Sequence, residues 1–204
     1  MNTIVLASNN GGKLREFAQL LAPYSVTLYP QSKFIAVGAD ETGATFIDNA
    51  LLKARHASQA AGLPAIADDS GIEVDALAGA PGVYSARFAG EHATDEDNNR
   101  KLLTELAGLP AAQRSARFRC ALAYVRSAAD PAPIVAEGVW EGHVLEQQRG
   151  ENGFGYDVLF LPDGHMQTAA ELSSEAKNKV SHRGQALRAL LALLIANRAI
   201  SVDV

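Results

Sequence analysis

Residues 63–77 read LPAIADDSGIEVDAL, and this stretch is central to both the fold class and the candidate site. Its apolar start is typical of a strand in the core of a sheet, and it stops at two adjacent acids, Asp68 and Asp69. The Ser-Gly pair that follows is common in turns, so we expect the strand to end on the two acids. Neighbouring carboxylates repel each other, and burying one without a partner costs free energy. The pair therefore predicts either an acidic turn or a site that holds a cation or activates a water molecule.

Strand patterns and helix patterns alternate on the N-terminal side of this stretch. Thr45 followed three residues later by Asp48 is a capping-box pattern, which marks the start of a helix. Leu14, Phe17 and Leu21 share one side of an earlier helix. The predicted elements are strands at residues 3–7, 26–29 and 64–68 and helices at residues 13–22 and 45–62. This alternation indicates an α/β protein.

The C-terminal side of the stretch changes character. Thr94 and Asp97 are placed to cap a helix that runs through Leu106. Two segments with the alternation of neighbouring antiparallel strands follow, and an Ala/Pro-rich loop tip at Ala128–Pro133 separates them. The predicted elements are strands at residues 116–125, 132–144 and 156–162 and a final helix with Leu187, Leu190, Leu191, Leu194 and Ile195 on its packed side. We expect a single domain over residues 1–204 with a mixed sheet and flanking helices.

Composition limits the class of protein. Of the 204 residues, 48% are hydrophobic and 20% are charged, which is typical of a globular protein with a sizeable core. The formal net charge of -5 disfavours nucleic acid as a partner. Cys120 is the only cysteine, which excludes an internal disulfide, fits a reducing compartment and favours a buried thiol. The chain begins without a basic leader, and the apolar run at 186–196 is too short to span a bilayer. We therefore expect a cytoplasmic protein with no membrane partner.

An Asn/Gly turn follows the first strand in the sequence SNNGGK, residues 8–13. A strand, a tight turn and a helix start place several backbone N–H groups at a helix N-terminus, where an anion is stabilised. Lys13 would add a full positive charge there. The segment is not a P-loop, because Ala7 stands at the position of that motif's first glycine and Leu14 replaces its Ser/Thr. Since Asn-Gly turns are widespread, the segment predicts either a phosphate site or a structural turn.

Two further clusters contain polar residues that could serve a ligand. The predicted helix at 45–62 carries Asn49 and Lys53 one turn apart, and Glu41 lies in the loop before it. In ENGFGYD, glycines bracket Phe154 just before a predicted strand. Taken alone, each cluster is also explained by solvated side chains or an ordinary loop.

The segment EAKNKVSHRGQAL, residues 175–187, leads into the final helix. Ser181 is placed to cap that helix, which leaves His182 and Arg183 in its first turn. Cations at a helix N-terminus oppose the macrodipole. A basic pair there favours a ligand-binding role over a helix-stabilising one. If both side chains are solvated, however, their position costs little free energy and needs no ligand.

The joint order of these clusters is more specific than any one of them. The segments SNNGGK, TFIDNALLKA, ADDSG, PGVYSARFAG, FGYD and SHRGQAL occur in the order and spacing of the inosine triphosphate pyrophosphatase family. The chain resembles the bacterial dITP/XTP pyrophosphatases of that family almost from end to end. Two departures are mild: Ser8 and Asn9 open a loop that often begins Thr-Gly, and Val158 stands where many members have proline.

The resemblance implies a fold, an activity and a set of site residues. The fold is a long twisted mixed sheet with flanking helices and two lobes around an active-site cleft, in a homodimer. The activity is the magnesium-dependent hydrolysis of a non-canonical purine nucleoside triphosphate (ITP, dITP or XTP) to the monophosphate and pyrophosphate. The resemblance makes Asp69 the catalytic carboxylate, Glu41, Asp68 and Asp69 the Mg²⁺ ligands, and Ser8, Asn9, Asn10, Gly11, Gly12, Lys13, Lys53, Ser70, Phe154, Gly155, Tyr156, Asp157, Lys177, His182 and Arg183 the substrate-binding residues.

Elementary chemistry is consistent with these roles. A bare acidic pair would repel a triphosphate, whereas carboxylate oxygens that hold Mg²⁺ would attract it. A carboxylate beside the metal can deprotonate the attacking water, and Lys13 and Lys53 can offset the charge that grows on the leaving pyrophosphate. At the base, donors from Lys177, His182 or Arg183 would pair with the 6-oxo group of hypoxanthine or xanthine.

Two other functions remain open at this stage. The first is a nucleotide sensor on the same scaffold that binds without turnover, which the set of three acids disfavours. The second is a pyrophosphatase for modified pyrimidines, which the match at SHRGQAL disfavours.

Overall fold

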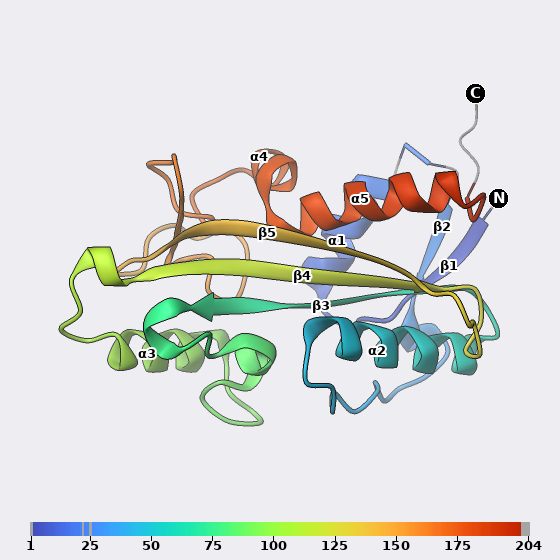
Figure 1. The fold of residues 1–204 in the computed structure, drawn as a ribbon, viewed down its shortest axis with the longest axis horizontal. Coiled ribbons are helices and arrows are strands. Elements are labelled where there is room, and N and C mark those ends of the chain that lie inside the picture. Colours follow the sequence, from blue (N-terminus) through green and yellow to red (C-terminus); the bar gives the residue numbers. More distant parts are fainter. Residues whose placement is uncertain (1, 22, 25, 201–204) are drawn as a thin grey trace. The chain divides into compact units, whose positions relative to one another are not determined.

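The computed structural model describes residues 2–21, 23–24 and 26–200, and Figure 1 shows the arrangement of their helices and strands. None of the helices in this described part of the chain is long and apolar enough to cross a membrane. The strands are β1 (Asn2–Leu6), β2 (Val26–Pro30), β3 (Ala65–Val74), β4 (Ser115–Val125), β5 (Ile134–Val144) and β6 (Phe160–Pro162). The α-helices are α1 (Gly11–Leu21), α2 (Phe46–Ala61), α3 (Asp95–Glu105), α4 (Ser174–Val180) and α5 (His182–Ala196). Short 3-10 helices are η1 (Gln31–Lys33), η2 (Asp75–Leu77), η3 (Gly82–Arg87) and η4 (Ala111–Gln113).

The strands form one mixed sheet in the order β2-β1-β3-β4-β5-β6. β1 pairs in parallel with both β2 and β3, whereas β5 and β6 are antiparallel. β4 and β5 are neighbours in the sheet, and the predicted loop tip at Ala128–Pro133 lies between them. The expected α/β class with a mixed sheet and flanking helices is therefore confirmed.

Strand β3 continues past the acidic pair, so the expected strand end at Asp68 and Asp69 and the expected turn after them are wrong. The strand runs on to Val74, and both Ile72 and Val74 are buried in a core. The backbone N–H of Ile72 also donates to the hydroxyl of Ser85 at 2.9 Å. Packing of the two apolar side chains therefore outweighs the turn propensity of the Ser-Gly pair.

The last predicted strand is also shorter than expected. β6 begins only at Phe160, and the residues before it form turns in which the N–H groups of Leu159 and Phe160 donate to the carbonyl of Tyr156. The Tyr156 hydroxyl donates to the carbonyl of Ser85 at 2.8 Å, which holds the turn in place. A strand over 156–159 is therefore wrong.

The predicted helices form, and their caps explain where two of them start. Thr45 and Thr94 each make a full capping box, with Asp48 and Asp97 respectively. Gly62, with φ +65, ends α2 in the left-handed conformation that glycine adopts without strain. Helix α4 has no counterpart among the predicted elements.

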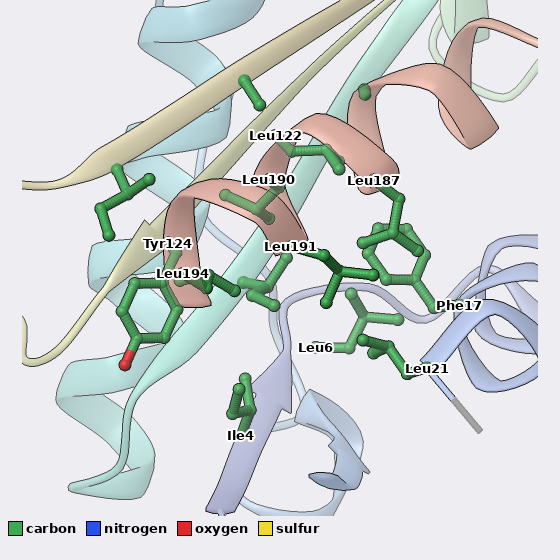
Figure 2. Packing of buried hydrophobic residues seen from close by; sticks show 14 of the residues in the cluster. Ile4, Leu6, Phe17, Leu21, Leu122, Tyr124, Leu187, Leu190, Leu191 and Leu194 are labelled. Atoms are coloured by element: carbon green, nitrogen blue, oxygen red, sulfur yellow. The ribbon is translucent and has the colours of Figure 1, made fainter. Parts of the chain in front are cut away.

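The final helix α5 packs as expected except at one position. Leu187, Leu190, Leu191 and Leu194 are buried, but Ile195 is 38% exposed, so its placement on the packed side is wrong. The residues of this helix that face the core lie with side chains of β1, α1 and β4 in one cluster (Figure 2).

The chain divides into two compact units, each assembled from separate segments. The first comprises the described residues within Met1–Asp69, Cys120–Gly138 and Arg183–Val204, and the second comprises Ser70–Arg119 and Val139–His182. Each unit has a hydrophobic cluster of its own. The first cluster includes Ile4, Leu6, Phe17, Leu122 and Leu190, and the second includes Ile72, Leu102, Phe118, Trp140 and Phe160. The single domain and the cleft expected from the resemblance stay predictions.

Candidate active site

Asp69 of β3 lies in a group of polar side chains that helix α2 presents. The Lys53 ammonium is 2.5 Å from Asp69 Oδ1 and 2.9 Å from Glu41 Oε1. One turn earlier on α2, the Asn49 amide donates to Asp69 Oδ2 at 3.4 Å. Because Asn49 and Lys53 are four residues apart, they share one face of the helix. The sequence prediction that placed Lys53, Glu41 and Asp69 in one site agrees with these contacts.

Burial and charge adjust both members of the Lys53–Asp69 pair. Burial raises the pKa of Asp69. The Lys53 ammonium lowers it by a smaller amount, so the pKa stays above its ordinary value. Burial lowers the pKa of Lys53, but the charges of Asp69 and Glu41 outweigh it and leave that pKa raised. Lys53 therefore stays cationic, while Asp69 accepts a proton more readily than an exposed aspartate does.

Asp68 contacts a different set of side chains. Lys13 forms an ion pair with Asp68 Oδ1, and Arg183 Nε donates to Asp68 Oδ2 at 2.8 Å. Arg183 Nη1 in turn donates to Glu16 Oε2 at 2.5 Å. The Asp68 side chain is fully buried. Burial raises its pKa, but the charges of Arg183 and Lys13 lower it far more, so the pKa lies well below its usual range. Asp68 therefore remains ionised as the centre of a buried network.

Cys120 on β4 is buried beside this network, as predicted for a thiol with a packing role. Its Sγ lies 3.2 Å from Asp68 Oδ2. Burial, followed by the Asp68 charge, raises the pKa of the Cys120 thiol well above its usual value. The thiol is therefore not a nucleophile near neutral pH.

The predicted phosphate turn carries its own cap. Asn10 Oδ1 accepts from the backbone N–H groups of Gly12 and Lys13 at 2.8 Å and 3.0 Å. The Ser8 hydroxyl accepts from the backbone N–H of Asn10 at 3.1 Å. The Asn10 amide thus takes the position at the start of α1 that an anion would take. Phosphate binding by Ser8, Asn9, Asn10, Gly11, Gly12 and Lys13 stays a prediction.

The segment with Phe154 forms a closed turn in the second unit. The Phe154 backbone N–H donates to Asp157 Oδ2 at 2.9 Å, and the Lys177 ammonium lies 2.6 Å from the same oxygen. The ammonium is 5.2 Å from the centre of the Phe154 ring. Gly153, with φ +81, lies so close to Asp157 that a Cβ at this position would overlap the carboxylate. Asp157 therefore fixes both the backbone before Phe154 and the cation beside its ring.

The remaining predicted base-binding residues are buried as well. His182 stacks on Phe118 with ring centroids 4.7 Å apart, and Trp140 lies 6.4 Å away. Ser181 precedes α5 in an extended conformation, as expected for a capping residue. Ser70 is half-buried within β3. Lys177 and Arg183 thus have their charged groups in ion pairs with protein carboxylates, and their predicted contacts with a base stay predictions.

The predicted metal ligands are divided between two ion-pair groups. Among residues 2–21, 23–24 and 26–200, no three His, Cys, Asp or Glu side chains are grouped as a metal site. Glu41 and Asp69 both contact the Lys53 ammonium, so their oxygens already converge on one positive charge. Both Asp68 oxygens contact cationic side chains. Metal binding by Glu41, Asp68 and Asp69 stays a prediction.

Comparison with known proteins identifies the family. A model described as the Ham1 family matches residues 4–193. The chain belongs to the Ham1 family. The dITP/XTP pyrophosphatase of Shewanella oneidensis is 56% identical over 191 residues, which cover 94% of this chain and 93% of that protein. The dITP/XTP pyrophosphatase of Photobacterium profundum is 54% identical over 194 residues, covering 95% and 98% respectively. A HAM1 protein structure from Coxiella burnetii matches with a TM-score of 0.88 at 47% identity, covering 96% of this chain and 100% of that one. The expected family is therefore confirmed.

Sequence reasoning missed several residues that hold the site of this Ham1-family chain together. Glu16 on α1 was not singled out, although it completes the Arg183–Asp68 network. Asn99 on α3 is 3% exposed, and its Nδ2 donates to the carbonyl of Gly155 at 3.0 Å. Asparagine is a poor helix former, so two consecutive asparagines within a predicted helix are a weak sequence signal, which indicates neither their burial nor their partners. Glu16 gave no comparable signal, because an acid on an amphipathic helix is ordinary.

Proposed function

We propose that this chain is a nucleoside-triphosphate pyrophosphatase that hydrolyses ITP, dITP and XTP to the monophosphate and pyrophosphate and so cleanses the nucleotide pool. One observation carries the proposal: Asp69 is held by Lys53 and Asn49 at the segment that matches the family signature. Relatives more than half identical over nearly the whole chain are named dITP/XTP pyrophosphatases, which supports this choice of substrate.

Asp69 acts as the general base in this reaction. A water molecule loses a proton to the Asp69 carboxylate and its oxygen attacks the α-phosphorus. The bond from the α-phosphorus to the bridging oxygen breaks, and that oxygen leaves with pyrophosphate.

Lys53 and Lys13 offset negative charge. Lys53 holds the Asp69 carboxylate in place and stays cationic, and Lys13 is 15% exposed at the start of α1. Positive charge at these positions stabilises the leaving pyrophosphate as its charge grows. The backbone N–H groups of the Asn/Gly turn position the outer phosphates, with a phosphate replacing the Asn10 amide as the acceptor at the helix start.

The donor set of Glu41 and Asp69 fits Mg²⁺. Both side chains present hard carboxylate oxygens around a single cationic position, which Lys53 supplies in this structure. When bound, Mg²⁺ would supply a positive charge that draws the phosphate oxygens to this site. The resemblance also makes Asp68 a ligand of the ion; both Asp68 oxygens contact Lys13 and Arg183 in this structure, and Mg²⁺ binding by Asp68 stays a prediction.

The family resemblance assigns the base end of the substrate to Phe154, Lys177, His182 and Arg183. Phe154 stacks on the purine, while Asp157 and Lys177 hold the ring and the turn around it. Donors from Lys177, His182 or Arg183 pair with the 6-oxo group, which adenine lacks. Ser70, Gly155 and Tyr156 complete the substrate-binding set.

The oligomeric state and location follow from the family resemblance. We expect a homodimer in the cytoplasm, with the nucleotide as ligand and neither nucleic acid nor membrane as partner. Light scattering after size exclusion measures the mass in solution, and a mass near the 21.5 kDa of one chain would contradict the dimer.

The deciding experiment is a substrate panel with product identification. Purified protein with Mg²⁺ is given dITP, XTP, ITP, ATP and GTP, and both the monophosphate and the pyrophosphate are quantified. We expect dITP, XTP and ITP to be converted with equal amounts of both products, and chelation to abolish turnover until Mg²⁺ is restored. Binding of ITP without any product would instead support a nucleotide sensor, and release of orthophosphate would contradict cleavage at the α-phosphorus.

A further inference from the structure

Helix α3 holds both main-chain polar groups of Gly155. Asp95 Oδ2 accepts from the Gly155 N–H at 2.7 Å, and Asn99 Nδ2 donates to the Gly155 carbonyl at 3.0 Å. Asp95 and Asn99 are four residues apart and therefore share one face of α3. These residues, together with Gly155, all belong to the second unit, so the grip lies within one compact body.

These two hydrogen bonds restrict the backbone of Gly155, a residue type with many accessible conformations. Gly155 has φ +63, a conformation that glycine adopts freely among several alternatives. Its N–H belongs to the peptide that follows Phe154, and its carbonyl belongs to the peptide that precedes Tyr156. Holding both groups fixes the two peptide planes around Gly155, and with them the direction in which the Phe154 ring leaves the backbone.

Asn99 is costly for stability in this position. It is 3% exposed within a helix, and its Oδ1 has no hydrogen-bond partner among the described residues. An unsatisfied buried acceptor opposes folding, and an apolar side chain of similar size would avoid that cost. A residue that lowers stability but holds a turn by a hydrogen bond is expected where the turn has a functional role.

We infer that Asp95 and Asn99 are positioning residues that set the affinity for the purine base through Gly155. They do not touch the substrate. They hold the turn Phe154–Asp157 so that the Phe154 ring is already oriented when the base arrives, which removes an ordering cost from binding. This inference rests on the proposed function, which assigns the base to Phe154.

Asp95→Ala is the variant that tests the inference, because Asp95 is exposed and its loss leaves the core intact. Asp95→Asn keeps an acceptor oxygen for the Gly155 N–H. Glu96→Ala is the matched control, since it removes one negative charge from the same helix turn without touching Gly155. For each protein, calorimetry measures the Kd for inosine monophosphate, and inhibition of dITP hydrolysis gives the Ki for tripolyphosphate, which has no base.

For Asp95→Ala we expect a Kd for inosine monophosphate about 5–20-fold weaker, which lies at or below the low end of the effect for one hydrogen bond to a charged acceptor because Asp95 is exposed to solvent. Its Ki for tripolyphosphate should stay within about twofold of the unmodified chain's. Asp95→Asn and Glu96→Ala should leave both constants near those of the unmodified chain. Asn99→Ala should repeat the loss in base affinity together with a lower melting temperature.

Two results would overturn the positioning role. The first is an unchanged Kd for inosine monophosphate in Asp95→Ala, and the second is an equal weakening of monophosphate and tripolyphosphate, which would indicate general damage. A different result bears on the proposed function alone: if the unmodified chain binds inosine monophosphate but releases no pyrophosphate from dITP, the hydrolase assignment fails. In that case, weaker monophosphate binding by Asp95→Ala would still support the positioning role of Asp95.

Discussion

Asp68 and Asp69 are consecutive residues of β3, yet their carboxylates contact two separate sets of cations. Asp68 binds Lys13 and Arg183, whereas Asp69 binds Lys53. Successive side chains of a strand point to opposite faces, so the continuation of β3 through the pair separates the two charges. The pKa values diverge accordingly, lowered for Asp68 and raised for Asp69. One acid is therefore suited to hold a network together and the other to accept a proton.

Asp69→Asn should keep the fold and lose turnover. The amide cannot accept a proton from water, and loss of a general base costs about 10²–10⁴-fold in kcat. Pyrophosphate release from dITP measures kcat, and the circular dichroism spectrum checks the fold. Asp163→Asn, at an exposed acid paired with His143, is the control and should leave kcat unchanged. Retention of most activity by Asp69→Asn would mean that another residue is the base.

Arg183→Leu should destabilise the protein strongly. It removes the cation between Asp68 and Glu16 and leaves Lys13 as an ion-pair partner of Asp68, and removing one partner of a buried ion pair costs about 3–5 kcal/mol. Urea unfolding measures the loss in free energy of unfolding. Arg100→Leu is the control, because Arg100 is 67% exposed and its ion pairs contribute about 0–1 kcal/mol. Unchanged stability in this variant would contradict the structural role of Arg183, and a lower preference for ITP over ATP would support its proposed contact with the base.

Strand β3 shows which parts of the fold could be predicted from the sequence and which could not. Apolar periodicity and capping boxes predicted the order of helices and strands, because these signals are local. The continuation of β3 past Ser70 and the shortness of β6 depend on contacts that Ser85 makes from a distant segment. A Ser-Gly pair carries the same local signal in a turn and in a buried strand, so only tertiary packing decides between them.

Contacts among some of the predicted site residues could be expected from the sequence, whereas the pairing of others could not, and the roles of all of them stay predictions. Lys53, Glu41 and Asp69 were placed together, and their contacts agree. The pairing of Asp68 with Arg183, 115 residues apart, had no sequence signal. The same holds for Gly155, which Asp95 and Asn99 grip from α3. The order of the motifs predicted which residues belong to the site. Their long-range contacts depend on the fold and could not be predicted from the motifs.

Asp130→Asn should lower the free energy of unfolding at neutral pH, and this difference from the unmodified chain should disappear at acidic pH. The Asp130 carboxylate accepts from the N–H groups of Arg126 and Ala132 at 2.8 Å and 3.0 Å. Burial raises the pKa of Asp130, but these hydrogen bonds and the Arg126 charge outweigh it, so the pKa is lowered. A group with a lowered folded pKa adds stability above its unfolded pKa and loses it as the pH falls through the folded value.

The difference in unfolding free energy between the unmodified chain and Asp130→Asn should therefore be about 1–3 kcal/mol at pH 7. It should begin to shrink below about pH 4, close to the ordinary pKa of aspartate. Urea unfolding at several pH values measures it. A difference that stays constant down to pH 3 would contradict the lowered pKa, because protonated Asp130 would then be as good a partner as the carboxylate.

Phe154→Ala should weaken binding of every purine nucleotide to a similar extent. The ring offers a stacking face to any purine, and loss of one stacked base contact costs about 1–3 kcal/mol, which is about 5–150-fold in affinity. Because stacking does not distinguish a 6-oxo from a 6-amino group, kcat/KM should fall alike for ITP and ATP, and their ratio should hold within about twofold. Leucine at this position keeps apolar bulk without an aromatic face, so Phe154→Leu is the matched control for packing. A fall confined to ITP would place Phe154 in base selection, and a fall that Phe154→Leu fully restores would show that bulk, and not stacking, is what Phe154 contributes.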